Sequence, residues 1–481
     1  MTLLLISLAV LIGGYFIYGL LVEKVFGVDP ARLTPALTKT DGVDYVVLPT
    51  WKVFLIQFLN IAGLGPIIGA IMGVMFGPAA FIWIVAGTIF GGAVHDFISA
   101  MMSIRSGGDS LPELVGRELG PAVKQTMRWF SILLLVLVAA VFVLTPSALL
   151  VKMSPDWAGP LFWTLVIFGY YMLATLVPVD KLIGRFYPIF GFALLFMAVG
   201  LLWVLLTGGH HIPDGFTEGL QTRRADEVAV FPMMFVSIAC GAISGFHATQ
   251  SPMMARCLKN EKLARPVFYG SMVAEGIVAL IWAAAAITFT GGYAELGDYL
   301  SANAAADLVN DISMGWLGTV GGLLALLGVV AAPITTGDTA LRSARLIVSD
   351  MFHVDQSKLA KRLLVSVPIF AAAAALMMID YSILWRYFAW CNQTLSVFTL
   401  WAATVYLARH NRAYVITLVP AIFMTVVVIT YIFFAPQPEG FGLGIAYATG
   451  IGVLVAAIFT ALFARYLILL RRGAIVHNVA Y

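Results

Sequence analysis

The chain has 481 residues, of which 61% are hydrophobic and 11% are charged. Soluble domains carry about 25% charged residues, so this composition excludes an ordinary cytosolic enzyme and favours a polytopic helical membrane protein. The net charge of +3 is too small to indicate nucleic-acid binding. Cys240, Cys257 and Cys391 show no paired spacing, so neither a disulfide framework nor a zinc motif is implied.

Apolar segments long enough to cross a bilayer recur along the whole chain. In the first half they lie at about 4–22, 53–76, 80–104, 128–150, 160–178, 183–206 and 231–254. In the second half they lie at about 264–289, 318–345, 362–380, 383–407, 414–434 and 443–468. The pattern predicts an all-α polytopic membrane protein with about 13 transmembrane helices and its termini on opposite sides.

The distribution of Lys and Arg predicts the orientation, because short cation-rich loops stay in the cytoplasm. With the N-terminus outside, 24 of the 28 cations fall in inner loops and the C-terminal tail. Only Lys152, Arg223, Arg224 and Arg386 then lie outside. We therefore expect the N-terminus outside and the C-terminus inside, with Met1–Val22 kept as the first span.

Two predicted spans are interrupted near their middles by Gly and Pro. The second reads NIAGLGP from Asn60 to Pro66, and the seventh reads CGAISGFH from Cys240 to His247. Glycine lowers helical propensity and proline removes a backbone donor, so both helices can break where the backbone lines a cavity. The alternative is that these residues kink the helices without a function.

The two interrupted spans are five spans apart, which suggests two inverted five-helix units of the kind found in many secondary transporters. We expect a first repeat at 51–207 and a second, inverted repeat at 230–408. Residues 1–50 form an N-terminal transmembrane helix and a cytoplasmic loop in this scheme. Residues 409–481 form two additional C-terminal helices and a tail.

A few charged side chains fall within the predicted spans, where each costs at least about 2.5 kcal/mol and is a functional candidate by default. Glu275 lies near the centre of span eight, and His95 and Asp96 lie together in span three. These three residues are candidates for proton handling. The alternative for Glu275 is a structural carboxylate, and an ion pair with Arg342 is favoured over a ligand role for Asp338.

Hydroxyl side chains interrupt the apolar pattern of the ninth span. Hard cations such as sodium prefer oxygen ligands. Carbonyls freed around Ala62 and Gly65 in the second span, together with Thr335 and Thr336, are therefore a candidate site for a sodium ion. The alternative is that these threonines bond to carbonyls of their own helix.

The polar residues of the two interruptions are the candidate substrate site. They are Asn60, Gly63, Gly65, Ser244, His247 and Gln250. Asn392 and Gln393 add amides from the eleventh span, and neutral donors of this kind suit a carboxylate with an amide or keto group. His247 alternatively is a hydrogen-bonded structural histidine. An intramembrane metallohydrolase is disfavoured, because no His-Glu-x-x-His pattern is present.

Four strings in this order resemble the carbon starvation protein A family. They are NIAGLGPIIGA (60–70), GGAVHDFIS (91–99), SGFHATQSPMMARC (244–257) and APITTGDTALRS (332–343). The resemblance implies uptake of peptides during carbon limitation, or import of pyruvate with protons in close relatives. It also implies a LeuT-like fold, with the cation site between spans two and nine and the substrate at the breaks of spans two and seven. The well-known enterobacterial members are longer than this chain.

These observations together predict a secondary-active importer in the inner membrane of a bacterium or archaeon. Its expected substrates are small peptides or a small carboxylate such as pyruvate, and its expected driving force is a proton or sodium gradient. No enzyme activity, nucleic-acid partner or cofactor is expected apart from a bound sodium ion, and the sequence leaves the oligomeric state open. A nutrient sensor that binds without transport, and a channel, are the alternatives.

Overall fold

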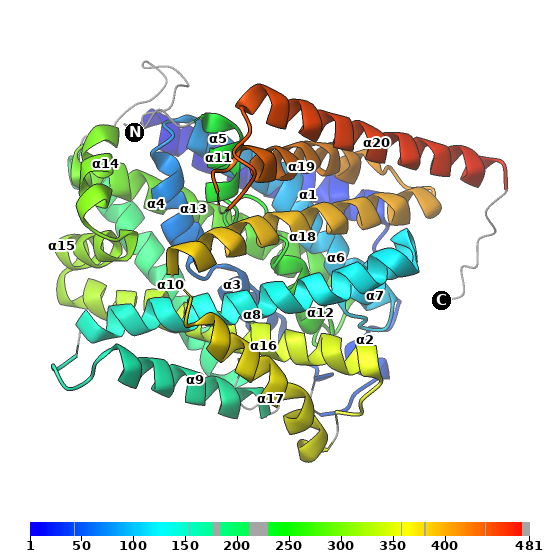
Figure 1. The fold of residues 1–481 in the computed structure, drawn as a ribbon, viewed down its shortest axis with the longest axis horizontal. Helices are drawn as coiled ribbons and strands as arrows, with labels where there is room; N and C mark the ends of the chain where they lie inside the picture. Colours follow the sequence, from blue (N-terminus) through cyan, green and yellow to red (C-terminus); the bar gives the residue numbers. More distant parts are fainter. Residues whose placement is uncertain are drawn as a thin grey trace.

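A computed structural model describes residues 1–42, 44–152, 154–176, 183–210, 229–356, 358–379, 381–437 and 439–473. These residues form an all-helical bundle (Figure 1). Most of the predicted outer loop at 208–229, including Arg223 and Arg224, lies outside the described residues, and so does Lys181. The boundary predicted near Asp380 also lies outside them, between α17 and α18.

The first half of the chain contains ten α-helices and two π-helical turns among the described residues. They are α1 Thr2–Phe26, α2 Pro35–Thr38, α3 Thr50–Ile61, η1 Gly65–Gly69, α4 Ala70–Val74, α5 Ala79–Ala86, η2 Gly87–Gly92, α6 Ala93–Arg105, α7 Leu111–Leu119, α8 Pro121–Lys152, α9 Pro160–Leu176 and α10 Ile183–Thr207.

The second half begins with the short helices on either side of the second interruption. Its elements are α11 Val230–Ser237, α12 His247–Ala255, η3 Glu261–Leu263, η4 Arg265–Tyr269, α13 Gly270–Thr290, α14 Tyr293–Ala302, α15 Ala305–Ala325, η5 Leu326–Val330, α16 Ala331–Phe352, α17 Leu359–Leu376, α18 Tyr381–Arg409, α19 Val415–Phe434 and α20 Ile445–Arg471.

Among the described residues, eight helices are long and apolar enough to cross a membrane, or up to ten if each of two bent pairs is one span. The chain is thus a multi-pass membrane protein, and the exact number of thirteen spans and the orientation stay predictions. In Figure 1 the helices run mostly lengthwise, with the start of α1 at the left and the end of α20 at the right.

The segment 290–316, which connects the predicted spans 264–289 and 318–345, is helical over much of its length. It contains α14 and the first part of α15, which bends at Gly318 where the backbone φ is +59°. Both pieces are amphipathic, since Leu296, Leu308 and Ile312 are buried while acidic residues stay exposed. The mean hydropathy of these two pieces is therefore too low to predict a membrane span. The spacing of their apolar residues is nevertheless that of an amphipathic helix.

Both interruptions predicted from Gly and Pro are present. Helix α3 ends at Ile61, residues 62–64 are non-helical, and the chain continues through η1 into α4 with a bend of 53°. Helix α11 ends at Ser237, and residues 238–246, which we call the linker, separate it from α12.

The two interruptions lie against each other in the interior. A Cβ atom added to Gly65 would lie 2.0 Å from Cβ of Cys240, so only glycine permits this approach. In the linker, Gly241 has φ +97°, a left-handed conformation that favours glycine. Helices α6, α13 and α16 pack around the interruptions. Helix α20 lies at one edge of the bundle, and only 11% of its apolar 18-residue stretch is buried.

Candidate functional site

Four ionisable side chains meet where α6, α12 and α13 come together, and we call them the acid–histidine cluster: His95, Asp96, His247 and Glu275. Asp96 holds both histidines: its Oδ1 lies 2.8 Å from Nδ1 of His95 and its Oδ2 lies 3.1 Å from Nδ1 of His247. Nε2 of His247 lies 3.6 Å from Oε2 of Glu275. All four side chains are buried, so the cluster is a continuous row of proton-binding groups inside the bundle.

His95 and Asp96, predicted as neighbours in one span and as candidates for proton handling, contact each other and a second helix. Both side chains reach each other, and Asp96 also reaches across to α12. The prediction for His247 left a hydrogen-bonded structural histidine as the alternative. Its Nδ1 does have such a partner, while its Nε2 has no hydrogen-bond partner within the described part of the chain.

The linker is fixed to α18 by one amide side chain. Oδ1 of Asn392 accepts hydrogen bonds from Oγ of Ser244 at 2.9 Å and from the backbone N–H of Phe246 at 2.7 Å. Nδ2 of the same side chain donates to Sγ of Cys240 at 3.5 Å. Asn392 and Ser244 therefore shape the linker, and this positioning role was not evident from the sequence, which marked both only as polar residues.

A second polar group, the threonine cluster, joins α16 to the first interruption and consists of Asn60, Thr336 and Thr339. Oγ1 of Thr336 donates to the carbonyl of Leu59 at 3.2 Å, and Oγ1 of Thr339 donates to Oδ1 of Asn60 at 3.3 Å. A Cβ added to Gly63 would lie 3.3 Å from Oγ1 of Thr336. The structure thus places Thr336, predicted for the cation site, beside Asn60 and Gly63, predicted for the substrate site, and Oγ1 of Thr336 also lies 3.0 Å from the carbonyl of Ala332 in its own helix.

The other three residues of the predicted sodium site, Thr335, Ala62 and Gly65, contact groups outside the threonine cluster. Oγ1 of Thr335 donates to the carbonyl of Ala332 in its own helix at 2.7 Å, which is the alternative that the sequence left open. The N–H of Ala62 donates to the carbonyl of Phe58 and closes the last turn of α3. Gly65 contacts Cys240 of the linker rather than the threonines.

Gln250 joins α12 to α16. Its Nε2 donates to Oγ1 of Thr249 at 2.9 Å and lies 3.4 Å from Oγ of Ser343. Its Oε1 and Nδ2 of Asn60 are buried and have no hydrogen-bond partner among the described residues. Buried amide groups that lack partners are expensive, and a polar substrate can supply the missing bonds.

Asp338 and Arg342, for which the sequence favours an intrahelical ion pair, bond to partners on other elements. The hydroxyl of Tyr187 on α10 donates to Oδ2 of Asp338. Arg342 donates from Nη2 to the carbonyl of Ala174 at 2.8 Å, and its Nη1 lies 3.5 Å from Oδ1 of Asp44. These contacts tie α16 to its neighbours and support a structural role.

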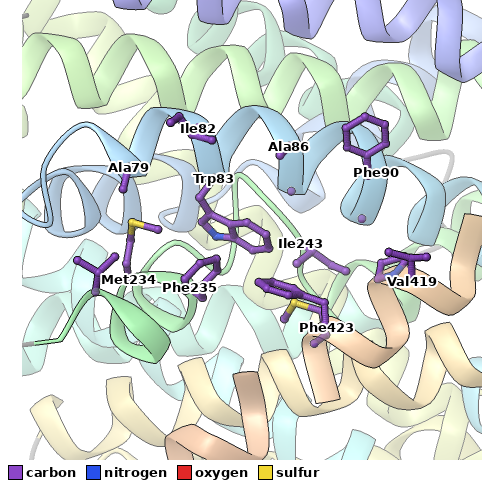
Figure 2. Close-up of a pocket in the computed structure, with 15 residues that line it drawn as sticks. Ala79, Ile82, Trp83, Ala86, Phe90, Met234, Phe235, Ile243, Val419 and Phe423 are labelled. Atoms are coloured by element: carbon purple, nitrogen blue, oxygen red, sulfur yellow. The ribbon is translucent and has the colours of Figure 1, made fainter. Parts of the chain in front are cut away.

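A separate cavity of about 440 Å³ lies between α5, η2, α11 and α19. Figure 2 shows its apolar lining, in which the rings of Trp83, Phe235 and Phe423 contact one another. Ile243 of the linker is part of this lining. The cavity offers no charged partner for a carboxylate or a cation, so the polar clusters are the better candidate for a site that binds a polar solute.

Among known proteins, a membrane protein of Haemophilus influenzae is 42% identical over 344 residues, covering 61% of this chain and 92% of the relative. The peptide transporter CstA of Escherichia coli is 29% identical over 57% of this chain. The pyruvate/proton symporter BtsT of the same organism is 28% identical over 57% of this chain. The chain spans about half the length of the two E. coli relatives, 48% and 47%.

Two solved transporter structures share the fold. A Na⁺-coupled sialic acid symporter matches with a TM-score of 0.54 and 14% identity, covering 99% of both chains. MhsT in complex with L-phenylalanine also matches with a TM-score of 0.54 and 14% identity, covering 86% of this chain and 99% of that one. At this identity the likeness shows the fold alone, which is the LeuT-like transporter fold that the family resemblance implied.

The family assignment rests on the sequence. The profile of the family described as carbon starvation protein CstA matches residues 1–162 and 158–315, which is more than half of the chain. The named relatives and the structural neighbours are transporters, which agrees with the prediction that the protein is not an enzyme. This chain belongs to the carbon starvation protein CstA family.

Proposed function

We propose that the protein is a secondary-active importer in the inner membrane, which moves small peptides or a small carboxylate such as pyruvate by alternating access. The names of the relatives support these two substrate classes. The observation that carries the proposal is the contact of Gly65 with Cys240, because it places two interrupted spans together beside a buried row of ionisable groups. Interrupted helices of this kind form the midplane sites of secondary transporters.

The substrate site is proposed at the facing polar groups of the two interruptions. Asn60, Gly63 and Gly65 contribute from the first, and Ser244, His247 and Gln250 from the second. Nδ2 of Asn60 and Oε1 of Gln250 have no hydrogen-bond partner in the part of the chain that the structure describes, so the first can donate to a substrate carboxylate and the second can accept from a substrate amide N–H. Residues 51–207 and 230–408 are the two proposed five-helix repeats that rearrange around this site.

Proton coupling is proposed for Glu275, Asp96 and His95, with His247 between the two acids. Hydrogen bonds of 2.8 and 3.1 Å join His95, Asp96 and His247, and a proton crosses the remaining 3.6 Å between His247 and Glu275 through a water molecule or a small movement of either side chain. A sodium ion is the second proposed coupling ion, held by Thr336 with Thr335, Ala62, Gly65 and the carbonyl of Leu59. The distance of 3.2 Å between Thr336 Oγ1 and Leu59 O suits two oxygens that share one hard cation, which lie about 3.4 Å apart.

The test is uptake of labelled pyruvate and of a labelled dipeptide into proteoliposomes, with proton and sodium gradients imposed separately. We expect accumulation of one substrate with an inward proton gradient, and its collapse when the gradient is dissipated. Accumulation that requires sodium would move the coupling site to the threonine cluster. Binding of a substrate without uptake or counterflow would contradict transport and favour a sensor.

A further inference from the structure

Three potential metal ligands converge where the linker meets α13. Sγ of Cys240, a ring nitrogen of His247 and a carboxylate oxygen of Glu275 all lie within 4.8 Å of one another. All three residues are buried, with exposed fractions of 6%, 0% and 0%. We propose that Cys240, His247 and Glu275 form a binding site for a borderline-soft divalent cation, with Zn²⁺ as the best match.

Within the described part of the chain, two of the three proposed ligand groups have ligand atoms without a hydrogen-bond partner, whereas Sγ of Cys240 donates to Oγ of Ser244 at 3.6 Å. Nε2 of His247 and both carboxylate oxygens of Glu275 have no hydrogen-bond partner among the residues that the structure describes. A buried imidazole nitrogen and a buried carboxylate seldom lack partners unless water or a ligand satisfies them. The distance of 3.6 Å between Nε2 and Oε2 already matches two ligands of one tetrahedral zinc ion, which lie about 3.5 Å apart.

The side chains that hydrogen-bond to His247 and Cys240 are of the kind that surround metal ligands in proteins. Ligating histidines usually donate their second ring N–H to a carboxylate, which fixes the tautomer and turns the other nitrogen toward the metal. Asp96 does this for His247 at 3.1 Å, and His95 in turn holds Asp96. On the other side, Nδ2 of Asn392 donates to Sγ of Cys240, which stabilises a thiolate.

The donor types select the class of ion. A thiolate, an imidazole and a carboxylate are all common zinc ligands, and three protein ligands leave a fourth position for water. Sodium and magnesium prefer oxygen ligands alone and would gain little from the thiolate. This site is therefore distinct from the proposed sodium site on the threonine cluster.

The location gives metal binding a structural consequence. Cys240 belongs to the linker, His247 begins α12 and Glu275 lies on α13, so one ion joins three elements. The three ligand atoms lie within 4.8 Å of one another, and Cys240 stands on non-helical backbone, where a small shift can bring Sγ closer to the other two. A bound ion then holds the second interruption in one conformation and stabilises the folded protein against heat.

The experiment measures metal binding directly, without substrate or a gradient, so its outcome does not depend on whether the protein transports. Purified full-length protein in detergent is stripped with a chelator and titrated with Co²⁺, a spectroscopic probe for Zn²⁺ sites. We expect one Co²⁺ per chain with thiolate-to-cobalt charge-transfer absorption, and displacement of Co²⁺ by Zn²⁺. Zn²⁺ should also raise the thermal midpoint.

Substitutions of the proposed ligands test which side chains bind the metal ion. Cys240→Ser should abolish the charge-transfer absorption, and Glu275→Gln should keep that absorption but weaken binding at least tenfold. Cys257→Ser is the matched control, since Cys257 is also buried but lies at the end of α12, and should bind like the wild type. Size-exclusion elution and thermal unfolding without metal establish that each variant is folded.

The double variant Cys257→Ser/Cys391→Ser keeps Cys240 as the only thiol and is informative even where Cys240→Ser fails to fold. Retention of the charge-transfer absorption in this variant supports the proposal. Loss of the absorption, no Co²⁺ binding by the folded wild type, or unchanged absorption in Cys240→Ser would overturn it.

Discussion

Glu275 combines full burial with two carboxylate oxygens that lack hydrogen-bond partners in the described part of the chain. Structural carboxylates inside proteins are normally hydrogen-bonded or paired. His247 faces this carboxylate, with its Nε2 3.6 Å from Oε2 of Glu275. This arrangement favours exchange of a proton at Glu275 over the structural role that the sequence left as the alternative.

Replacement of Glu275 by Gln keeps the shape of the side chain but prevents proton release. We expect loss of proton-driven accumulation in proteoliposomes, by tenfold or more, with substrate exchange at equal concentrations still measurable. Glu295→Gln on the exposed face of α14 is the matched control and should accumulate substrate normally. Unchanged accumulation by the Glu275 variant would exclude its role as proton carrier.

At the scale of the elements, the contact between the two interrupted spans depends on one missing side chain. A Cβ at position 65 would overlap Cys240, because the two Cβ atoms would be 2.0 Å apart. Gly65→Ala should therefore force η1 away from the linker and reduce uptake at least tenfold. Gly13→Ala in α1 is the control, since an added Cβ there meets no atom within 4 Å.

A double variant tests whether the overlap itself is the cause. Gly65→Ala combined with Cys240→Gly removes the opposing side chain, so it should recover part of the uptake that Gly65→Ala loses. The measurement is initial uptake rate per unit of folded protein in the vesicles. No recovery would mean that Gly65 acts through its backbone conformation rather than through this contact.

Helix α7 lies outside the apolar spans, and ion pairs hold it against the start of α8. Nη2 of Arg128 donates to Oε1 of Glu113 at 2.6 Å, and Lys124 bonds to the other oxygen. Burial acts to raise the pKa of Glu113, but the hydrogen bonds from Lys124 and Arg128 outweigh it, so the pKa lies below its usual value of 4.5.

A lowered carboxyl pKa stabilises the folded state above the unfolded value of about 4.5, and this contribution disappears as the pH falls through the folded pKa. Because the group is partly exposed, we expect only about 0.5–1 kcal/mol. Glu113→Gln should thus lower the thermal midpoint in detergent at pH 7 by about 1–3 °C. The difference from the wild type should shrink at pH 4, and a constant difference at both pH values would contradict the ion-pair explanation.

At the scale of the whole molecule, the orientation in the membrane follows from the cation distribution and is open to a direct test. The three native cysteines are buried, so the wild-type background of labelling should be low. We expect a cysteine introduced at Asp298 to react with a membrane-impermeant thiol reagent added to intact cells. One introduced at Asn411 should react only after permeabilisation, and the reverse pattern would invert the topology.

The sequence alone determined the features that depend on short windows of residues. Long apolar runs predict membrane helices because the bilayer requires them, and Gly65, Pro66 and Gly241 mark the interruptions because of their backbone properties. Two of the four family strings, 60–70 and 244–257, include residues of these same interruptions. The amphipathic α14 and the part of α15 before Gly318 were not predicted as helices, because their mean hydropathy resembles that of a loop.

Only the tertiary structure decided which polar residues act together. Asp96 and His247 are 151 residues apart, yet a hydrogen bond joins them because α6 packs against α12. Cys240 looked like a small apolar residue in the sequence, and its place beside His247 and Glu275 depends on the path of the linker and the packing of α13. Such contacts are set by the packing of distant helices, which no local pattern of residues encodes.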